Sequence, residues 1–478
     1  MQAIKKIIPY VFGIVTLVAI VWLGSIVSQA LLRQESLPDH ADAKVADEMA
    51  QQLLQAKCAD CHGPSPEINT VINFFSGNML RRDVALARRA WKMEGDPAVR
   101  SGIVDYLKLD HVLRTRCMPP VQYTAVHLGS RLTPQDVAIL RLRYSEQGAA
   151  QRRFLPIEPA QADPSLIARQ YLGYLLYHDA RLSSNNEISC SSCHNISLGG
   201  TDNKAKSEGV PGADGKPQLG GVNAPTVFNA AGHIRQFWDG RAADLKEQAG
   251  GPPLNPVEMG YSSPEDWEKI AEKLQQDDFL LALFRYAYGN DGITGDSITD
   301  AIATFERTLM TPDSAFDQFL KGDAHALSDD QKKGLESFVN YGCATCHAGP
   351  ALGGLSFEYI NKRGPFRSHT PGYEEGAFGL RDHTKLDEHT DMFRVPTLRN
   401  VALTHPYFHT GKVEKLEDAV RIMFDTQVGA VPSDSVVGQV VRFLEAQTGK
   451  FRGIPLDELK PEDVIPAGET IMVAPEKE

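Results

Sequence analysis

The sequence has no excess of positive charge, little cysteine and little of the alternation that strands show. Its 478 residues include 49 Lys and Arg against 61 Asp and Glu, which gives a net charge of −12. An acidic chain of this kind lacks the electrostatic footprint of a nucleic-acid-binding protein. Alternating apolar and polar residues are scarce, so no large sheet is expected and the predicted fold class is mainly α.

Cysteine is scarce, yet six of the seven cysteines belong to three copies of the pattern Cys-x-x-Cys-His. The copies are Cys58-Ala-Asp-Cys61-His62, Cys190-Ser-Ser-Cys193-His194 and Cys343-Ala-Thr-Cys346-His347. In c-type cytochromes the two thiols bond the haem vinyl groups and the histidine ligates the iron. Redox pairs, zinc knuckles and structural disulfides also use paired cysteines, but none of them requires the histidine. Three covalent c-type haems are therefore predicted.

The long uncharged hydrophobic run of the chain lies near its beginning, from about residue 7 to 27. About 20 apolar residues match a membrane-spanning helix, and the lysines before the run place the N-terminus in the cytoplasm. We expect 1–30 to be a single-pass anchor in a bacterial inner membrane and 31–45 a tether, with the haem domains in the periplasm. A cleaved signal peptide is the alternative, because Ser28-Gln29-Ala30 resembles a cleavage site.

The first predicted haem domain spans 46–148. A Met-Pro loop at Cys117-Met118-Pro119-Pro120 precedes a helix start at Thr133-Pro134, which is the layout of a small cytochrome c domain. Met118 is therefore the predicted axial ligand opposite His62. The alternatives are Met79, Met93, His111 and His127. Cys117 belongs to no haem motif and is predicted to be a buried thiol.

After a linker at 149–163, two more haem domains are predicted, at 164–312 (completed by 452–478) and at 313–451. Together with the first domain they make three cytochrome c-like haem domains after an N-terminal transmembrane helix.

Local signals refine this arrangement in two places. A helix over 328–341 starts with a capping box, Ser328-x-x-Gln331, and leads into Cys343. The segment between His194 and Asn223 is rich in Gly, Lys and Asp, which predicts a long mobile loop.

Several long motifs between about 160 and 450 resemble the bacterial dihaem cytochrome c peroxidases. They are Leu175-Leu176-Tyr177-His178-Asp179-Ala180-Arg181-Leu182-Ser183, Asn223-Ala224-Pro225-Thr226, Gln236-Phe237-Trp238-Asp239-Gly240-Arg241, Asn255-Pro256-Val257-Glu258-Met259 and Leu403-Thr404-His405-Pro406-Tyr407-Phe408-His409. The added haem motif and the anchor resemble the triheme, membrane-bound subgroup, which includes quinol peroxidases.

The resemblance implies a role for each haem. The haem on His194 would be the peroxidatic one, with Gln248 and Glu258 lining its distal pocket. The haem on His347 would transfer electrons, with Met423 as its axial methionine. Trp238 would lie between these two haems.

The resemblance also implies one Ca2+ between the domains. Asn223, Thr404 and Pro406 match the positions that bind it, through one side-chain oxygen and two backbone carbonyls.

Many dihaem members carry a histidine after the second motif that blocks the peroxidatic iron. Here no histidine lies between His194 and His233, and the remaining candidates are three lysines, Lys204, Lys206 and Lys216. We therefore expect an open or water-bound iron, with His233 as a residue that could swing in.

The predicted function is a haem peroxidase that reduces hydrogen peroxide with electrons from quinol. Glu258 would move the proton between the peroxide oxygens and Gln248 would orient them. Alternatives are the same enzyme fed by a soluble periplasmic cytochrome c, a MauG-like protein-modifying enzyme, and a non-enzymatic electron carrier or sensor. The MauG-like reading is disfavoured because that branch has a Tyr at the position of Met423. A homodimer is possible, as in the dihaem relatives.

Overall fold

The computed structural model describes residues 154–161, 163–289, 292–370 and 377–466, with a few isolated positions before them. By its contacts the chain divides into two units, and the continuous described runs belong to the second unit. The predicted anchor, tether and first haem domain, with Cys58, Cys61, His62 and Met118, lie outside the described residues.

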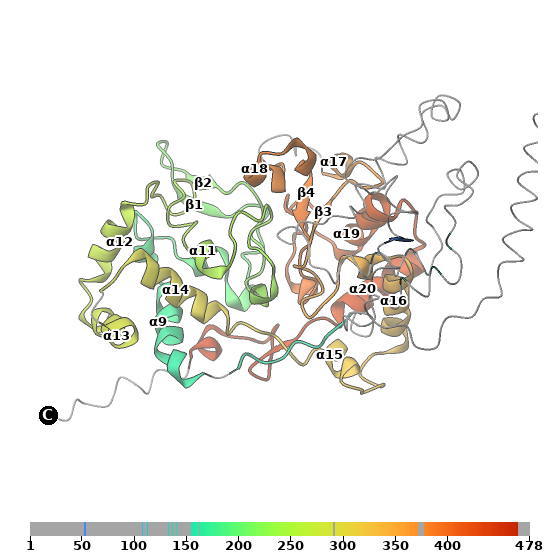
Figure 1. The fold of residues 1–478 in the computed structure, drawn as a ribbon, viewed down its shortest axis with the longest axis horizontal. Coiled ribbons are helices and arrows are strands. Elements are labelled where there is room, and N and C mark those ends of the chain that lie inside the picture. The colour runs from blue at the N-terminus through green and yellow to red at the C-terminus, as the bar shows by residue number, and fades with distance from the viewer. Residues whose placement is uncertain are drawn as a thin grey trace, which may run out of the picture. The chain divides into compact units, whose positions relative to one another are not determined.

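Short and medium-length helices dominate the described runs, as Figure 1 shows. The longer helices are α9 (Ile167–Tyr177), α12 (Asp266–Leu274), α13 (Asp278–Tyr288), α14 (Gly295–Glu306), α16 (Asp329–Asn340), α19 (Leu416–Met423) and α20 (Asp434–Glu445). The shorter helices are α10 (Cys190–Cys193), α11 (Leu245–Ala249), α15 (Ala315–Leu320), α17 (Phe366–His369) and α18 (Leu380–Thr384). The prediction of a mainly α fold is confirmed.

Strands among the described residues form three antiparallel pairs. The pairs are β1 (Glu208–Pro211) with β2 (Pro217–Leu219), β3 (Phe357–Tyr359) with β4 (Met392–Arg394), and β5 (Lys450–Phe451) with β6 (Ile454–Pro455). The first pair lies inside the segment that the sequence predicts to be a long loop. Composition alone did not reveal this hairpin, because the turn of β1 onto β2 uses few of the β-branched residues that mark strands.

Helices α9 and α14 are at the centre of the first core, a cluster of buried residues to which α12 and α13 also contribute. α14 begins with a capping box, in which Thr294 Oγ1 accepts a bond from Ser297 N (3.1 Å) and Ser297 Oγ accepts one from Thr294 N (3.0 Å). The two helices approach closely at Gly173, where a Cβ would lie 1.9 Å from the carbonyl oxygen of Ala301. Phe451 and Leu456, beyond α20, complete this cluster.

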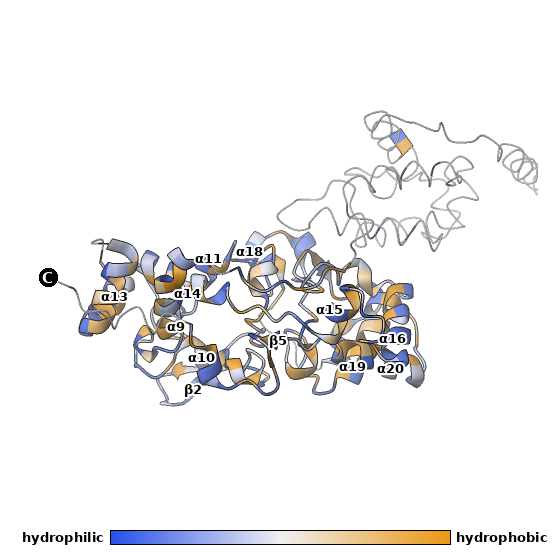
Figure 2. Ribbon diagram, turned by 90° about the horizontal axis from the view of Figure 1, so that it is seen from below, coloured by the Kyte–Doolittle hydropathy of each residue, from blue (hydrophilic) through white to orange (hydrophobic). Residues whose placement is uncertain are grey.

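Helices α16 and α20 are at the centre of the second core, and Figure 2 shows both hydrophobic and hydrophilic residues on each of them. α16 starts after Ser328, whose amide donates to Gln331 Oε1 at 2.8 Å, so the predicted capping box is confirmed. This pair also crosses at a glycine, since a Cβ on Gly334 would lie 2.0 Å from the Gln439 carbonyl oxygen. In each core, one helix of the close pair thus precedes the Cys-x-x-Cys-His motif in the sequence and the other follows it.

A buried polar cluster ties the segment before α9 to the second core. Arg399 and Asp317 form an ion pair of 2.7 Å with both side chains inaccessible to solvent. Arg399 Nη2 also donates to the carbonyl oxygen of Leu155, and Ile157 N donates to Asp317 Oδ1 (3.0 Å). The segment at Leu155 and Ile157 therefore packs on the second core, and the chain then runs into α9 of the first. In the described part of the chain, no helix has the length and hydropathy needed to span a membrane.

Candidate functional site

The second Cys-x-x-Cys-His motif forms the single-turn helix α10. Ser189 caps it, with its amide donating to Ser192 Oγ at 3.0 Å. The hydroxyl of Tyr177, at the end of α9, donates to the carbonyl oxygen of His194 at 2.5 Å. Burial lowers the pKa of His194 and keeps the imidazole neutral, which is the form that ligates a metal. The first core thus positions this histidine through α9.

Glu258 lies beside this motif on the turn that follows Asn255. Its amide donates to Asn255 O (3.1 Å), and its carbonyl accepts from Val210 of β1 (3.0 Å). Burial raises the pKa of the Glu258 carboxyl, while the Arg241 charge and a bond from Asn255 oppose the rise. Burial also raises the pKa of the Cys193 thiol to about 11, and the carboxylate of Glu258 adds to the increase. A half-buried carboxyl with a raised pKa therefore stands close to the predicted haem attachment site.

Arg241 lies in the loop before α11, and its charge acts on Glu258, whereas Gln248 belongs to α11 itself. Gln248 is half-buried and lies three residues before Gly251, where a Cβ would be 3.2 Å from the Phe237 ring. The Arg241 guanidinium lies 3.4 Å from the centroid of that ring, on an exposed side chain. The resemblance assigned no role to Arg241, although it belongs to one of the matching motifs.

The third motif lies after α16, and its histidine has a defined orientation. His347 Nδ1 is 3.0 Å from the carbonyl oxygen of Leu352, so this nitrogen carries the proton and donates. That tautomer leaves Nε2 as the unprotonated nitrogen, which is the arrangement of a metal-ligating histidine. Burial is the largest influence on the His347 pKa and lowers it to about 4, so the ring is neutral near pH 7.

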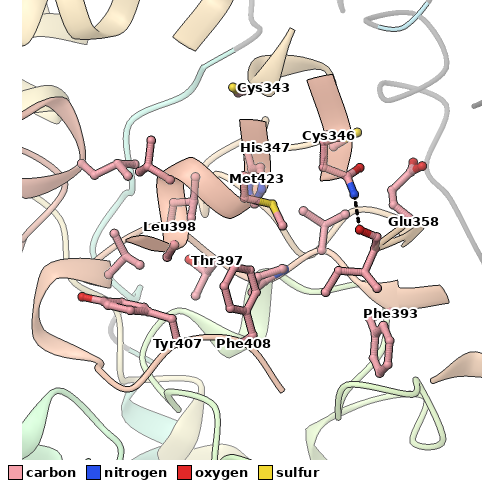
Figure 3. A pocket seen from close by; sticks show the side chains of 18 of the residues that line it. Cys343, Cys346, His347, Glu358, Phe393, Thr397, Leu398, Tyr407, Phe408 and Met423 are labelled. Carbon is pink, nitrogen blue, oxygen red and sulfur yellow. Dashed lines mark hydrogen bonds between the residues drawn. The ribbon is translucent and has the colours of Figure 1, made fainter. Parts of the chain in front are cut away.

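A cavity of about 290 Å3 adjoins this histidine, and Figure 3 shows its lining side chains. Cys343, Cys346 and His347 line it together with Met423, the last residue of α19. A cysteine pair, a neutral imidazole and a thioether sulfur are the donor set of a c-type haem with His/Met ligation. The residues present therefore fit the predicted group at this motif.

Trp238 is buried in the wall of the same cavity. Its indole Nε1 donates to the carbonyl oxygen of Asn223 at 2.9 Å, and its own carbonyl accepts from Arg394 N at 2.9 Å. The ring meets His409 edge-on, with centroids 6.0 Å apart. Trp238 is thus fixed on both sides by residues far away in the sequence.

Asn223, Thr404 and Pro406, the predicted calcium ligands, all line this cavity as well. Asn223 is buried, its amide donates to His409 O (2.9 Å) and its Nδ2 donates to Lys204 O (2.8 Å). The peptide bond between His405 and Pro406 is cis. An amide oxygen and backbone carbonyls are hard oxygen donors of the kind that Ca2+ accepts.

Comparisons with known proteins identify the family of this chain. A profile described as "Di-haem cytochrome c peroxidase" matches residues 168–325, and one described as "Haem-binding domain" matches 19–146. Cytochrome c peroxidase Ccp of Escherichia coli is 39% identical over 418 residues, covering 84% of this chain and 87% of that protein. The chain belongs to the di-haem cytochrome c peroxidase family. It is a haem peroxidase.

Two further relatives of this peroxidase extend the comparison. Cytochrome c551 peroxidase of Nitrosomonas europaea is 43% identical over 307 residues, which are 64% of this chain and 88% of that protein. Among solved structures, a MauG-like protein associated with microbial copper homeostasis has a TM-score of 0.52 at 24% identity, covering 62% of this chain and 93% of its own. That structure shows that the helical fold is shared.

The residues that could block the peroxidatic iron lie in different places. Lys204, Lys206 and Lys216 are exposed, and Lys204 pairs with Glu208 at 3.3 Å. His233 lines the cavity of the third motif, next to Gly354. The expectation that His233 could swing in at the peroxidatic iron stays a prediction. The structure adds that His233 shares a cavity with His347, which its position 39 residues after His194 did not reveal.

Proposed function

We propose that this haem peroxidase reduces hydrogen peroxide to water at the haem of Cys190, Cys193 and His194. A haem there would supply the redox chemistry that cleaves the oxygen–oxygen bond. The balanced reaction is H2O2 + 2 e⁻ + 2 H⁺ → 2 H2O, so the protein must deliver protons and electrons. The observation that supports this proposal most directly is the half-buried carboxyl of Glu258, with its raised pKa, beside Cys193.

Glu258 would accept the proton from one peroxide oxygen and return it to the oxygen that leaves as water. A carboxyl with an ordinary pKa is almost fully ionised near pH 7 and is a poor proton donor, whereas burial brings it closer to the working range. Gln248 would orient the peroxide with its amide. Arg241, which lowers the pKa of Glu258, would keep enough of the carboxyl ionised to accept a proton.

Electrons would reach the peroxidatic haem by way of the haem of Cys343 and Cys346, which His347 and Met423 would hold. His/Met ligation favours a high potential, which suits a relay to a strong oxidant. Trp238 is buried in the cavity wall and would couple this haem to the peroxidatic one. Met423 at this position favours the peroxidase over a MauG-like protein-modifying function.

Replacing Glu258 with Gln tests the assignment. We expect peroxide turnover to fall by about 10²–10⁴-fold, because the amide cannot shuttle a proton. Haem content and the ferric spectrum should remain unchanged, since no attachment residue is altered. Glu265→Gln, at an exposed carboxyl before α12, is the control and should retain activity. Full activity of E258Q would refute the role of Glu258.

We further propose that the protein is a triheme enzyme anchored in the bacterial inner membrane, with its haem domains in the periplasm and one Ca2+ at Asn223, Thr404 and Pro406. The hydrophobic run at 7–27, the Cys58 motif and the match of 19–146 to a haem-binding domain support this arrangement. In it, Met118 and His62 would ligate the first iron, which would receive electrons from membrane quinol. A periplasmic cytochrome c is the alternative donor.

Steady-state peroxide reduction by the full-length protein separates the two donors. We expect reduced quinol alone to support turnover, and the activity to be lost when His62 is replaced by Ala. Turnover only with added reduced cytochrome c would identify the soluble carrier as the donor. The ferric spectrum of the same sample should show one high-spin or water-ligated haem; three fully six-coordinate haems without peroxide reactivity would indicate an electron carrier.

A further inference from the structure

Arg394 is a buried cation without an anionic partner among the described residues. It lies at the end of β4 with 3% of its surface exposed, and its Nη1 is buried without a hydrogen-bond partner. Its Nε donates to the carbonyl oxygen of Phe237 at 3.0 Å, which satisfies only part of the guanidinium. Burial lowers its pKa to about 10, yet the group remains charged near pH 7. A buried charge of this kind is costly unless an anion neutralises it.

His233 is a second buried polar group, and it lines the same cavity as Arg394. Both of its ring nitrogens are buried and make no hydrogen bond of normal geometry among the described residues, while the Gln236 side chain lies close enough to raise the pKa of the ring. The ring is held against Gly354, where an added Cβ would lie 2.1 Å from His233 Cδ2. Burial and then the nearby charge of Arg394 lower the pKa of His233, so the imidazole is neutral and the two groups are close together. A neutral imidazole can donate one hydrogen bond to an acceptor in the cavity.

The cavity that both residues line is the one adjoining His347 and Met423. A haem attached through Cys343 and Cys346 would bring two propionates into this cavity, and these carboxylates would need hydrogen-bond donors. Figure 3 shows Phe393, the residue before Arg394, on the opposite side of the cavity from Cys343 and Cys346. Arg394 and His233 line this cavity and present to it buried nitrogens whose hydrogen bonds no described residue satisfies.

We propose that Arg394 and His233 form a carboxylate clamp for the propionate edge of the haem attached at Cys343 and Cys346. The clamp rests on the proposed haem at this motif and adds to it the residues that set its potential. A guanidinium can hold a carboxylate with charge-assisted bonds, and the imidazole can add one more donor. Both are positioning residues, because they act on the haem periphery and on neither the iron nor peroxide.

The clamp also connects this haem to the segment that carries Trp238. Arg394 donates from its main-chain N to Trp238 O (2.9 Å) and from its side-chain Nε to Phe237 O (3.0 Å). One residue thus binds the propionate edge and fixes the neighbouring backbone. A free propionate stabilises the extra positive charge of the ferric haem. Because the Arg394 cation offsets the propionate charge, the ferric state becomes less favourable and the reduction potential of the haem rises.

The test is a spectroelectrochemical titration of the full haem-loaded protein, following the ferrous bands of its His/Met-ligated haems. For Arg394→Gln we expect the equilibrium between ferric and ferrous forms of one such haem to shift about tenfold toward ferric, which is about 59 mV for one electron. Arg394→Lys keeps the charge and should shift it less. His233→Leu removes one donor and should give a smaller shift in the same direction.

Arg363→Gln is the matched control, because it removes a positive charge from an exposed side chain of the same core that does not line the cavity. Resonance Raman spectra of the same samples report the propionate bending modes. These modes should move in the Arg394 and His233 variants and stay constant in the control. Covalent haem content, measured by pyridine haemochrome, should be three in every variant.

The possible outcomes separate the clamp from the haem assignment. A haem content below that expected from intact motifs would contradict the proposed haem at Cys343 rather than the clamp. With full haem content, potentials and propionate bands of R394Q and H233L that equal those of R363Q would overturn the clamp. A wild-type potential that follows the chloride or phosphate concentration would also overturn it, since a free anion would then occupy the site. If R394Q does not fold, R394K and H233L carry the same comparison.

Discussion

At the scale of single residues, burial changes what the ionisable groups of this peroxidase can do. Glu258 and Glu306 both have raised pKa values because burial penalises the charged carboxylate. For Glu306, at the end of α14, the pKa rises to about 8, and its buried Oε2 has no hydrogen-bond partner among the described residues. The same residue types on the surface would be ionised at neutral pH. Neighbouring charges then adjust each value, as Arg241 does for Glu258.

The first prediction concerns the acid limb of the pH profile. Glu258 must be ionised to accept a proton, so kcat/KM should rise as the pH rises through its pKa. Arg241 lowers that pKa, so Arg241→Gln should raise it and move the acid limb to higher pH. Arg241→Lys keeps the charge and should leave the limb in place. An identical profile for both variants would show that the charge of Arg241 does not reach Glu258.

A second prediction concerns Glu306 and stability. Its folded pKa of about 8 exceeds the ordinary 4.5, so between these values the folded state holds a proton that the unfolded state releases. The free energy of unfolding therefore falls as the pH rises across this window. Glu306→Gln should remove this dependence and give a higher Tm than the natural protein at about pH 9, with little difference at about pH 5.

The exposed carboxyl of Glu336, on α16, provides the comparison. Glu336→Gln should leave the Tm and its pH dependence unchanged. If E306Q kept the slope of the natural protein between these two conditions, the buried carboxyl would not be its source.

At the scale of elements, each core depends on one helix pair that crosses at a glycine. Gly173 allows α9 to approach α14, and Gly334 allows α16 to approach α20. The first pair has a functional consequence, because α9 ends at Tyr177, which holds the backbone of His194. A change in the distance between these helices would therefore displace His194, the predicted iron ligand.

Gly173→Ala should destabilise the protein by about 1–3 kcal/mol, because the new methyl group would overlap the Ala301 carbonyl. Thermal unfolding, followed by circular dichroism, measures the loss. Gly438→Ala is the matched control on α20, where a Cβ would meet nothing within 4 Å. It should stabilise the protein by about 0.5–1 kcal/mol through helix propensity. If G173A unfolded at the same temperature as the natural protein, the two helices would be able to move apart without loss of stability.

At the scale of the second unit, buried polar groups join the two cores. Asn229 Nδ2 and Asn400 Nδ2 both donate to Thr311 Oγ1, at 2.8 and 3.0 Å. The Arg399–Asp317 pair connects the segment at Leu155 with the second core. Arg399 and Asn400 lie between Leu398 and Val401, which line the cavity beside His347.

Breaking the buried pair should be far more costly than breaking a surface pair. Arg399→Met leaves Asp317 buried without its partner and should reduce the free energy of unfolding by about 3–5 kcal/mol. Arg421→Met removes a largely exposed pair with Asp434 and should cost about 0–1 kcal/mol. Urea unfolding of both variants measures the difference. Equal losses would show that Arg399 contributes no more than a surface charge.

The sequence by itself determined the features that are encoded locally. The Cys-x-x-Cys-His motifs predicted haem, and the peroxidase family confirms haem binding. The capping box at Ser328 predicted the start of α16, because both of its partners lie within one helical turn. The motif around Trp238 and Glu258 also indicated the family, because it combines several residues at short spacings.

Only the tertiary structure decided which distant residues meet. It put His233 and Arg394, 161 positions apart, in the wall of the cavity beside His347. In the folded protein Glu258 is half-buried beside Cys193, and this burial is what raises the pKa of its carboxyl. The spacing of residues along the chain does not predict such contacts, because the burial of a side chain and its charged neighbours depend on how distant segments pack together.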